Sequence, residues 1–136
     1  MDIDFHSKSL PTARLIWHCP FVCLFNSTNG KVTDDDYKEF ALIRFDGEVW
    51  ETADFADNDI IINKNDSFDG WDKWKKLNKD GMDCHVHLKR DGKRITMNTD
   101  NGGIFLKCIT TIKTYDEDVY VALTGDQIAL TKIFIN

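Results

Sequence analysis

Four tryptophans, at positions 17, 50, 71 and 74, are the side chains in this sequence best suited to contact a ligand. An indole can stack on the apolar face of a sugar ring, while nearby amides and carboxylates bind the sugar hydroxyls. Trp50 and Trp71 each follow an Asp-Gly pair, which indicates a turn and therefore a loop position. We expect Trp50 and Trp71 to be the main ligand-binding candidates. Trp17, a few residues before Pro20, is a third candidate, and the sequence leaves open whether it binds or packs.

The segment around the last two tryptophans, SFDGWDKWKKLNKDG, predicts a short helix. Trp71, Trp74 and Leu77 have helical spacing, and lysines occupy the other side. Asp69 is a suitable N-cap, and Gly81 ends the segment. This pattern predicts that Trp74 is buried with Leu77 beside it, fixing the helix across one end of the fold. Trp71, at the helix start, could equally pack inward or face outward.

His85 and His87 stand two residues apart, so a strand would place both imidazoles on one face. That spacing can chelate a metal, but no third ligand is evident, and two solvent-facing histidines are expected instead. The acidic stretches TDDDY, ADFADND and NKNDSFDG could supply oxygens to calcium. They lack the glycine and the terminal glutamate of an EF-hand loop, so solvated loop charge is the expected state and no metal is predicted.

The cysteines and the known catalytic motifs give no sign of an enzyme. Cys19, Cys23, Cys84 and Cys108 form no CxxC pair, and we expect four reduced, buried thiols that pack as small hydrophobes. There is no GxSxG elbow, no HExxH helix and no glycine-rich phosphate loop. We therefore expect no catalytic residues and no cofactor.

Alternation of apolar and polar residues is the strongest structural signal. CHVHLK and RITMN alternate on either side of Asp91-Gly92, which predicts a hairpin with a type I′ turn. A slip in the alternation of IALTKIFI predicts a β-bulge near Thr131-Lys132. The residues expected to be buried between two sheets are Val86, Leu88, Ile95, Leu106, Ile112, Val121, Leu123 and Leu130.

These strands, with DIDFH, ARLIWHCPFVCLF, EFALIRF and DIIIN, predict eight or nine strands in one domain spanning residues 1–136. Many short antiparallel strands and one small helix are typical of an all-β sandwich of the jelly-roll kind. Pro20 is expected to place its strand at a sheet edge or at a bulge. A chain of 136 residues can bury a core without disulfides or metal.

Charge and hydropathy exclude several classes of partner. The net charge of −6 argues against nucleic acid, and no apolar run is long enough to span a bilayer. The first residues, MDIDFHSKSL, lack the basic and apolar regions of a signal peptide. The protein would be cytoplasmic if this chain is full length, and extracellular if it is a module trimmed from a larger protein.

The order of several features resembles a family of jelly-roll modules from gut Bacteroidetes and Clostridia. These features are FVCLF, then YKEFALIRFDG with a tryptophan shortly after, DGWDKWKK, a hairpin ending in RITMNTDNGG, and DVYVALTGDQIALTKI. The resemblance covers roughly residues 13–136, although the tryptophan-rich first strand of the family is missing here. Modules of this family resemble carbohydrate-binding modules and accompany glycoside hydrolases or surface and sensory proteins, so the resemblance implies glycan binding.

Two functions follow as hypotheses. The first is a non-catalytic carbohydrate-binding β-sandwich module from a bacterial protein, with Trp50, Trp71 and Trp17 as its ligand-binding residues. The second is a small intracellular β-sandwich that recognises or senses other proteins, which four free thiols and the missing signal peptide favour.

Overall fold

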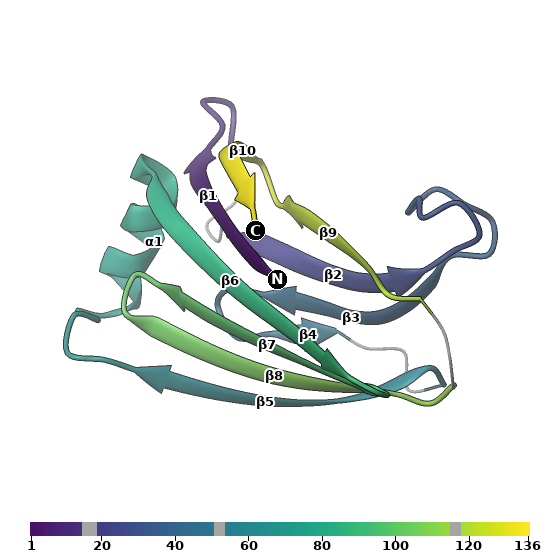
Figure 1. Cartoon of the computed structure of the whole chain (residues 1–136). Helices are drawn as coiled ribbons and strands as arrows, with labels where there is room; N and C mark the ends of the chain where they lie inside the picture. The colour runs from purple at the N-terminus through teal and green to yellow at the C-terminus, as the bar shows by residue number, and fades with distance from the viewer. Residues whose placement is uncertain (15–18, 51–53, 115–117) are drawn as a thin grey trace.

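The computed structural model describes residues 1–14, 19–50, 54–114 and 118–136, with the side chains of Val49 and Trp50 left out. Two antiparallel sheets face each other, and helix α1 (Trp71–Asp80) lies at one end (Figure 1). The predicted all-β sandwich with one short helix is confirmed. The larger sheet has the order β10 (Ile128–Ile135), β1 (Asp2–Ser9), β6 (Met82–Asp91), β7 (Arg94–Asn101), β8 (Ile104–Ile112) and β5 (Ala56–Lys64). The smaller sheet has the order β4 (Val49–Trp50), β3 (Lys38–Arg44), β2 (Pro20–Asn26) and β9 (Tyr120–Gly125).

The core lies between the sheets and follows the alternation of the sequence. Strands β6, β7 and β8 form a meander whose inward side chains are buried in a period-two pattern. Five of the eight predicted core residues are buried, namely Val86, Leu88, Ile95, Leu106 and Ile112. The other three, Val121, Leu123 and Leu130, are only partly buried, because β9 and β10 are the outermost strands of their sheets.

The predicted hairpin and bulge are both present, with one change in the turn. Asp91 pairs with Arg94, so the turn centres on Gly92 and Lys93. Gly92 has φ of +61° and Lys93 has no positive φ, which fits a type II′ turn rather than type I′. In β10, Lys132 has φ of +53°, and two residues there oppose Phe5 alone on β1. The bulge therefore lies at the predicted place.

Pro20 marks neither a sheet edge nor a bulge in its own strand, the two alternatives that were predicted. Strand β2 lies between β3 and β9 and pairs with both. Pro20 is the first residue of the strand, where a missing N–H is tolerated. The irregularity in this part of the sheet is instead on β3, where the register shifts opposite Leu24 and Phe25.

Helix α1 is fixed to the sandwich by Trp74 and Asn78 rather than by Trp74 and Leu77. Trp74 is 1% exposed, and its indole donates a hydrogen bond of 3.3 Å to the carbonyl of Asn101 in the β7–β8 turn. Asn78 is also buried and donates to the carbonyl of Trp74. Leu77 is 43% exposed, so the prediction that it shares the buried face is wrong. The inward face follows i, i+4 spacing because α1 approaches β1, where the Ser9 hydroxyl donates to the carbonyl of Asn78.

The helix ends differ in how well the sequence predicted them. Gly81 ends α1 as expected, with its N–H bonded to the carbonyl of Leu77. Asp69 is not the N-cap, because Gly70 occupies that position with no side-chain cap, and the Asp69 carboxylate pairs with Lys73 instead. No helix in the described ranges is long and apolar enough to cross a bilayer.

The four cysteines are all buried and free, as expected. Burial raises the pKa of Cys19 and of Cys84 to about 12, so both remain protonated thiols at neutral pH. Cys23 contacts the hydroxyl of Tyr37 at 3.1 Å. All four behave as small core side chains.

Candidate functional site

The candidate site is built on the tight turn that follows β3. The N–H of Arg44 bonds to the carbonyl of Glu48 at 2.8 Å, and the N–H of Gly47 bonds to the carbonyl of Arg44 at 3.0 Å. A carboxylate oxygen of Asp46 accepts the N–H of Glu48 at 3.1 Å. Gly47 has φ of +102°, and a Cβ there would lie 2.2 Å from Cδ1 of Ile62. The turn therefore depends on glycine both for its backbone conformation and for its packing on β5.

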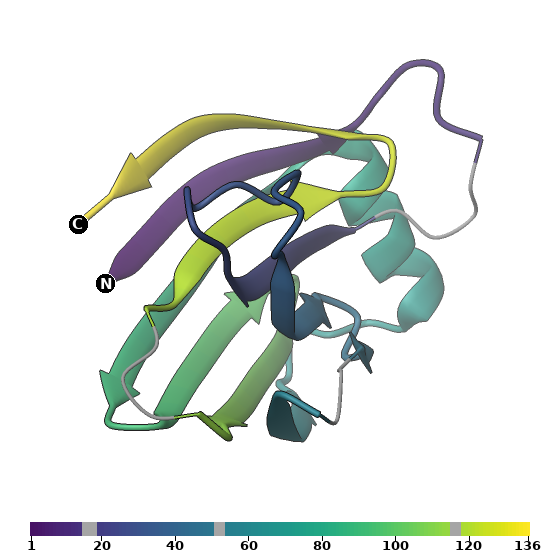
Figure 2. The same cartoon turned by 90° about the vertical axis from the view of Figure 1, so that its right-hand side faces the viewer.

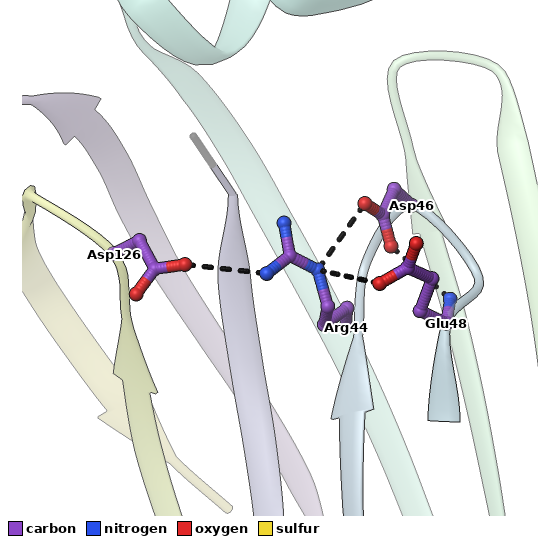
Figure 3. A network of polar contacts seen from close by, with 4 residues as sticks. All are labelled: Arg44, Asp46, Glu48 and Asp126. Carbon is purple, nitrogen blue, oxygen red and sulfur yellow. Dashed lines mark hydrogen bonds and ion pairs between the residues drawn. The ribbon is translucent and has the colours of Figure 1, made fainter. Parts of the chain in front are cut away.

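Arg44 gathers three carboxylates around one guanidinium (Figure 3). Its Nε lies 3.2 Å from Asp46 and 3.7 Å from Glu48, while a terminal nitrogen lies 3.2 Å from Asp126 in the β9–β10 turn. The guanidinium also stacks 4.6 Å from the ring centroid of Phe21. These ion pairs join the turn that follows β3 to the β9–β10 turn.

Burial differs sharply among these charges. The side chains of Arg44 and Asp46 are 12% and 11% exposed, whereas those of Asp126 and Glu48 are 40% and 64% exposed. Burial by itself lowers the pKa of Arg44, but the neighbouring Cys19 and Asp46 more than offset it, and the pKa is raised. Arg44 and Asp46 thus form a fixed, desolvated pair, and Glu48 and Asp126 keep oxygens toward solvent.

Trp71 stands beside this cluster as the first residue of α1. It is half-buried and makes edge-to-face contacts with Phe68, at 5.3 Å between ring centroids, and with Trp74, at 5.6 Å. The ammonium of Lys64 lies 5.2 Å from the centroid of the Trp71 ring and 5.0 Å from that of Phe68. The indole is held in place by its aromatic neighbours, and the exposed Lys64 ammonium contacts its ring.

Trp71, Arg44, Asp46 and Glu48 line one pocket of about 470 Å³. This volume lies within the range of small-ligand sites. Of the predicted binding residues, Trp71 lies in this pocket, while Trp17 and the side chain of Trp50 lie outside the described part of the chain. The backbone of Trp50 pairs with Leu42, which places Trp50 on β4 directly after the turn.

The sequence did not single out Arg44, Asp46 or Glu48. Their signal is the run RFDGE, in which charged residues surround an Asp-Gly turn at the end of a strand. That run meets Trp71 and Asp126 in the folded protein. These residues are far apart in the sequence, so a pattern of neighbouring residues cannot predict that they lie together.

The two histidines, His85 and His87, face solvent, as expected, and each contacts an aspartate of β1. Nδ1 of His85 lies 2.7 Å from Asp4, and Nδ1 of His87 lies 2.8 Å from Asp2. His6 and Asp83 form a third pair at 3.0 Å, so the outer faces of β1 and β6 carry a row of Asp-His contacts. Among the described residues, no group of three or more His, Cys, Asp or Glu side chains is arranged to hold a metal.

The acidic loop after β2 uses its carboxylates internally. Asp36 accepts the N–H of Thr28 at 3.1 Å and also the Thr28 hydroxyl. Asp34 accepts the N–H groups of Asn29 and Lys31. These carboxylates bind the backbone of their own loop, which differs from the fully solvated charge expected from the sequence.

The comparisons with known proteins give no relative for this chain. No family model matches the sequence, no curated protein matches it, and no solved structure matches the fold.

Proposed function

We propose that this β-sandwich is a non-catalytic carbohydrate-binding module and that the pocket between Trp71 and the Arg44–Glu48 turn is its binding site. The observation that carries the proposal is the shared lining of this pocket by one indole, one guanidinium and two carboxylates. An indole offers a flat apolar surface to the C–H face of a pyranose. Carboxylates accept hydrogen bonds from sugar hydroxyls, and a guanidinium donates to them.

The polar groups of the pocket are oriented by contacts within the protein. Within the described residues, the ion pairs of Arg44 use Nε and one terminal nitrogen, and the second terminal nitrogen carries no contact in Figure 3. Glu48 is the most exposed of the three carboxylates. On binding, sugar hydroxyls replace hydrogen bonds to water with hydrogen bonds to the protein, and the net gain in free energy is modest. Trp71 must therefore supply much of the binding free energy.

A glycan array on the purified protein identifies a ligand, and calorimetry then tests the site. Trp71→Ala should weaken binding of that ligand by tenfold or more, which corresponds to about 1.4 kcal/mol. Glu48→Gln should weaken it by a smaller factor, because one charged acceptor is replaced by a neutral one. Circular dichroism at the temperature of the assay checks that each variant is folded.

Phe105→Ala is the matched control. Phe105 is 40% exposed on the outer face of the larger sheet, so it offers another aromatic surface away from the pocket. Its removal should leave the affinity within twofold of the wild type. If Phe105→Ala abolished binding and Trp71→Ala did not, the glycan site would lie on the sheet face and the pocket assignment would be wrong.

A second candidate function is recognition of another protein, and one observation favours it. Ile133, Phe134 and Ile135 are 50%, 61% and 60% exposed on the edge strand β10. Exposed apolar residues beside unpaired backbone groups suit addition of a strand from a partner. A glycan array with no hits, together with a change in chemical shifts of β10 on addition of a partner, would favour this function over sugar binding.

A further inference from the structure

A second and larger pocket lies further along α1, between the helix and the loop that follows β1. Its volume is about 920 Å³, and it is open to solvent. Leu10, Pro11 and Ala13 form its aliphatic wall. The cationic side chains that line it are Lys8, Arg14, Lys75, Lys76 and Lys79, and among the described lining residues only Asp80 carries a carboxylate.

This concentration of positive charge is unusual for a chain with a net charge of −6. Lys76 lies 4.0 Å from Asp80. Within the described residues, Lys8, Arg14 and Lys79 contact no carboxylate. Lysines near the C-terminal end of a helix are stabilised by the helix dipole, but Lys8 and Arg14 come from the strand and loop opposite. The dipole therefore does not account for their position in the pocket.

The walls of the pocket are fixed by contacts that do not involve its charges. The N–H of Leu10 bonds to the carbonyl of Gln127 at 2.8 Å, and the N–H of Arg14 bonds to the Gln127 side chain at 2.6 Å. The Ser9 hydroxyl reaches the carbonyl of Asn78 on α1 at 3.4 Å. The loop is thus tied to Gln127 and the end of β1 is joined to the helix, and cations mounted on walls fixed in this way lose less freedom on binding an anion.

The pocket and the Trp71 site lie along the same helix. Trp71, Lys75 and Lys79 are spaced at i, i+4 and i+8, so they form one row along α1 over about 12 Å. Trp71 belongs to the first pocket, and Lys75 and Lys79 belong to the second. A ligand of several sugar units bound at Trp71 and extended along the helix would reach the cations.

We propose that the groove between Leu10–Arg14 and α1 is an anion subsite and that the glycan bound by this domain is an acidic polysaccharide carrying sulfate or carboxylate groups. The extension from Trp71 rests on the function proposed above, whereas the anion subsite itself rests on the groove. Among the described residues that line the groove none is aromatic, so these residues offer no stacking surface to a nucleobase.

Dextran sulfate and neutral dextran, which share one polysaccharide backbone, test the proposal by calorimetry. Dextran sulfate should bind the full chain, neutral dextran should bind at least tenfold more weakly, and carboxymethyl dextran should lie between them. Affinity for dextran sulfate should fall as salt rises, since cation–anion contacts at an open surface are screened. The triple variant Lys8→Gln, Arg14→Gln, Lys79→Gln should lose at least tenfold in affinity for dextran sulfate.

The control is Lys89→Gln, Arg94→Gln, Lys107→Gln, which removes the same charge from exposed positions on the larger sheet. It should keep the affinity for dextran sulfate within twofold. An equal loss in the control, equal binding of dextran and dextran sulfate, or tighter binding of single-stranded DNA than of dextran sulfate would each overturn the subsite.

Trp71→Ala separates this proposal from the function on which it partly rests. If dextran sulfate binding survives Trp71→Ala and fails in the groove triple variant, the anion subsite stands and the Trp71 site does not. If an array glycan requires Trp71 but binds the groove variant normally, the module function stands and the anion subsite is refuted.

Discussion

Two buried threonines differ in whether the side-chain hydroxyl has a hydrogen-bond partner. The hydroxyl of Thr110 donates to Asn58 at 2.5 Å, whereas within the described residues the hydroxyl of Thr99 has no partner. Both side chains are inaccessible, at 0% and 3% exposure, and both lie on interior strands of the larger sheet. Valine has nearly the same shape and keeps the β-branch that a strand favours.

We expect Thr99→Val to leave the free energy of unfolding unchanged or to raise it by about 1 kcal/mol, because it removes a buried hydroxyl that has no protein partner. Thr110→Val should instead lower that free energy by about 1 kcal/mol, since it breaks the bond to Asn58. Urea unfolding of the two variants and the wild type measures both values. A loss in Thr99→Val as large as that in Thr110→Val would show that its hydroxyl is satisfied in solution.

At the scale of elements, α1 depends on one tryptophan far more than on its apolar neighbour. Trp74→Ala should cost about 3–5 kcal/mol, because it empties a buried site against Asn101 and Gly102. Leu77→Ala, one turn further along the helix and 43% exposed, should stay within about 1 kcal/mol of the wild type. Thermal melts test the pair, and similar losses in both would place the inward face of the helix where the sequence had predicted it.

The elements also differ in how well the sequence predicted them. Strands β6, β7 and β8 follow directly from alternation because short turns connect them and each residue's face depends only on its neighbours. The prediction for Pro20 failed because one neighbour of β2 is β9, which comes from a distant part of the chain, whereas the other, β3, is the next strand in sequence. The face of α1 was misread because Asn78, a polar residue, is buried where Leu77 was expected.

At the scale of the whole molecule, the candidate site was only partly predictable. Trp71 could be proposed from its type and its place after an Asp-Gly pair. Its companions could not, because Arg44, at the end of β3, meets Asp126 of the β9–β10 turn across the intervening strand β2. The basic groove likewise joins Lys8 and Arg14 to the lysines of α1, and only the predicted row of helix lysines was visible in the sequence.

Acid stability is a property of the whole molecule that the acidic loop should influence. The hydroxyl and N–H of Thr28 bond to Asp36 and lower its pKa. A carboxyl whose pKa is lower in the folded state stabilises the fold above its unfolded pKa of about 3.9. That stabilisation is lost as the pH falls through the lower, folded value.

We therefore expect Asp36→Asn to lower the melting temperature near pH 6, with the difference from the wild type shrinking below about pH 4. Asp35→Asn is the matched control, because within the described residues the neighbouring Asp35 makes no hydrogen bond or ion pair. Melting temperatures from pH 2.5 to 7 measure the effect. A deficit in Asp36→Asn that stays constant over this range would contradict the pKa shift as its cause.

The pairing of β1 with β10 also determines how the domain responds to mechanical force. Ile3 pairs with Ile135, and Asp2 and Asn136 exchange two backbone hydrogen bonds, so both ends of the chain lie together (Figure 2). The bonds of an antiparallel pair run across the strands. Tension applied to the two ends therefore loads these hydrogen bonds one after another, starting with the pair at the chain ends, rather than all at once. The domain should yield at low force by peeling β10 away from β1 while the meander of β6, β7 and β8 remains intact.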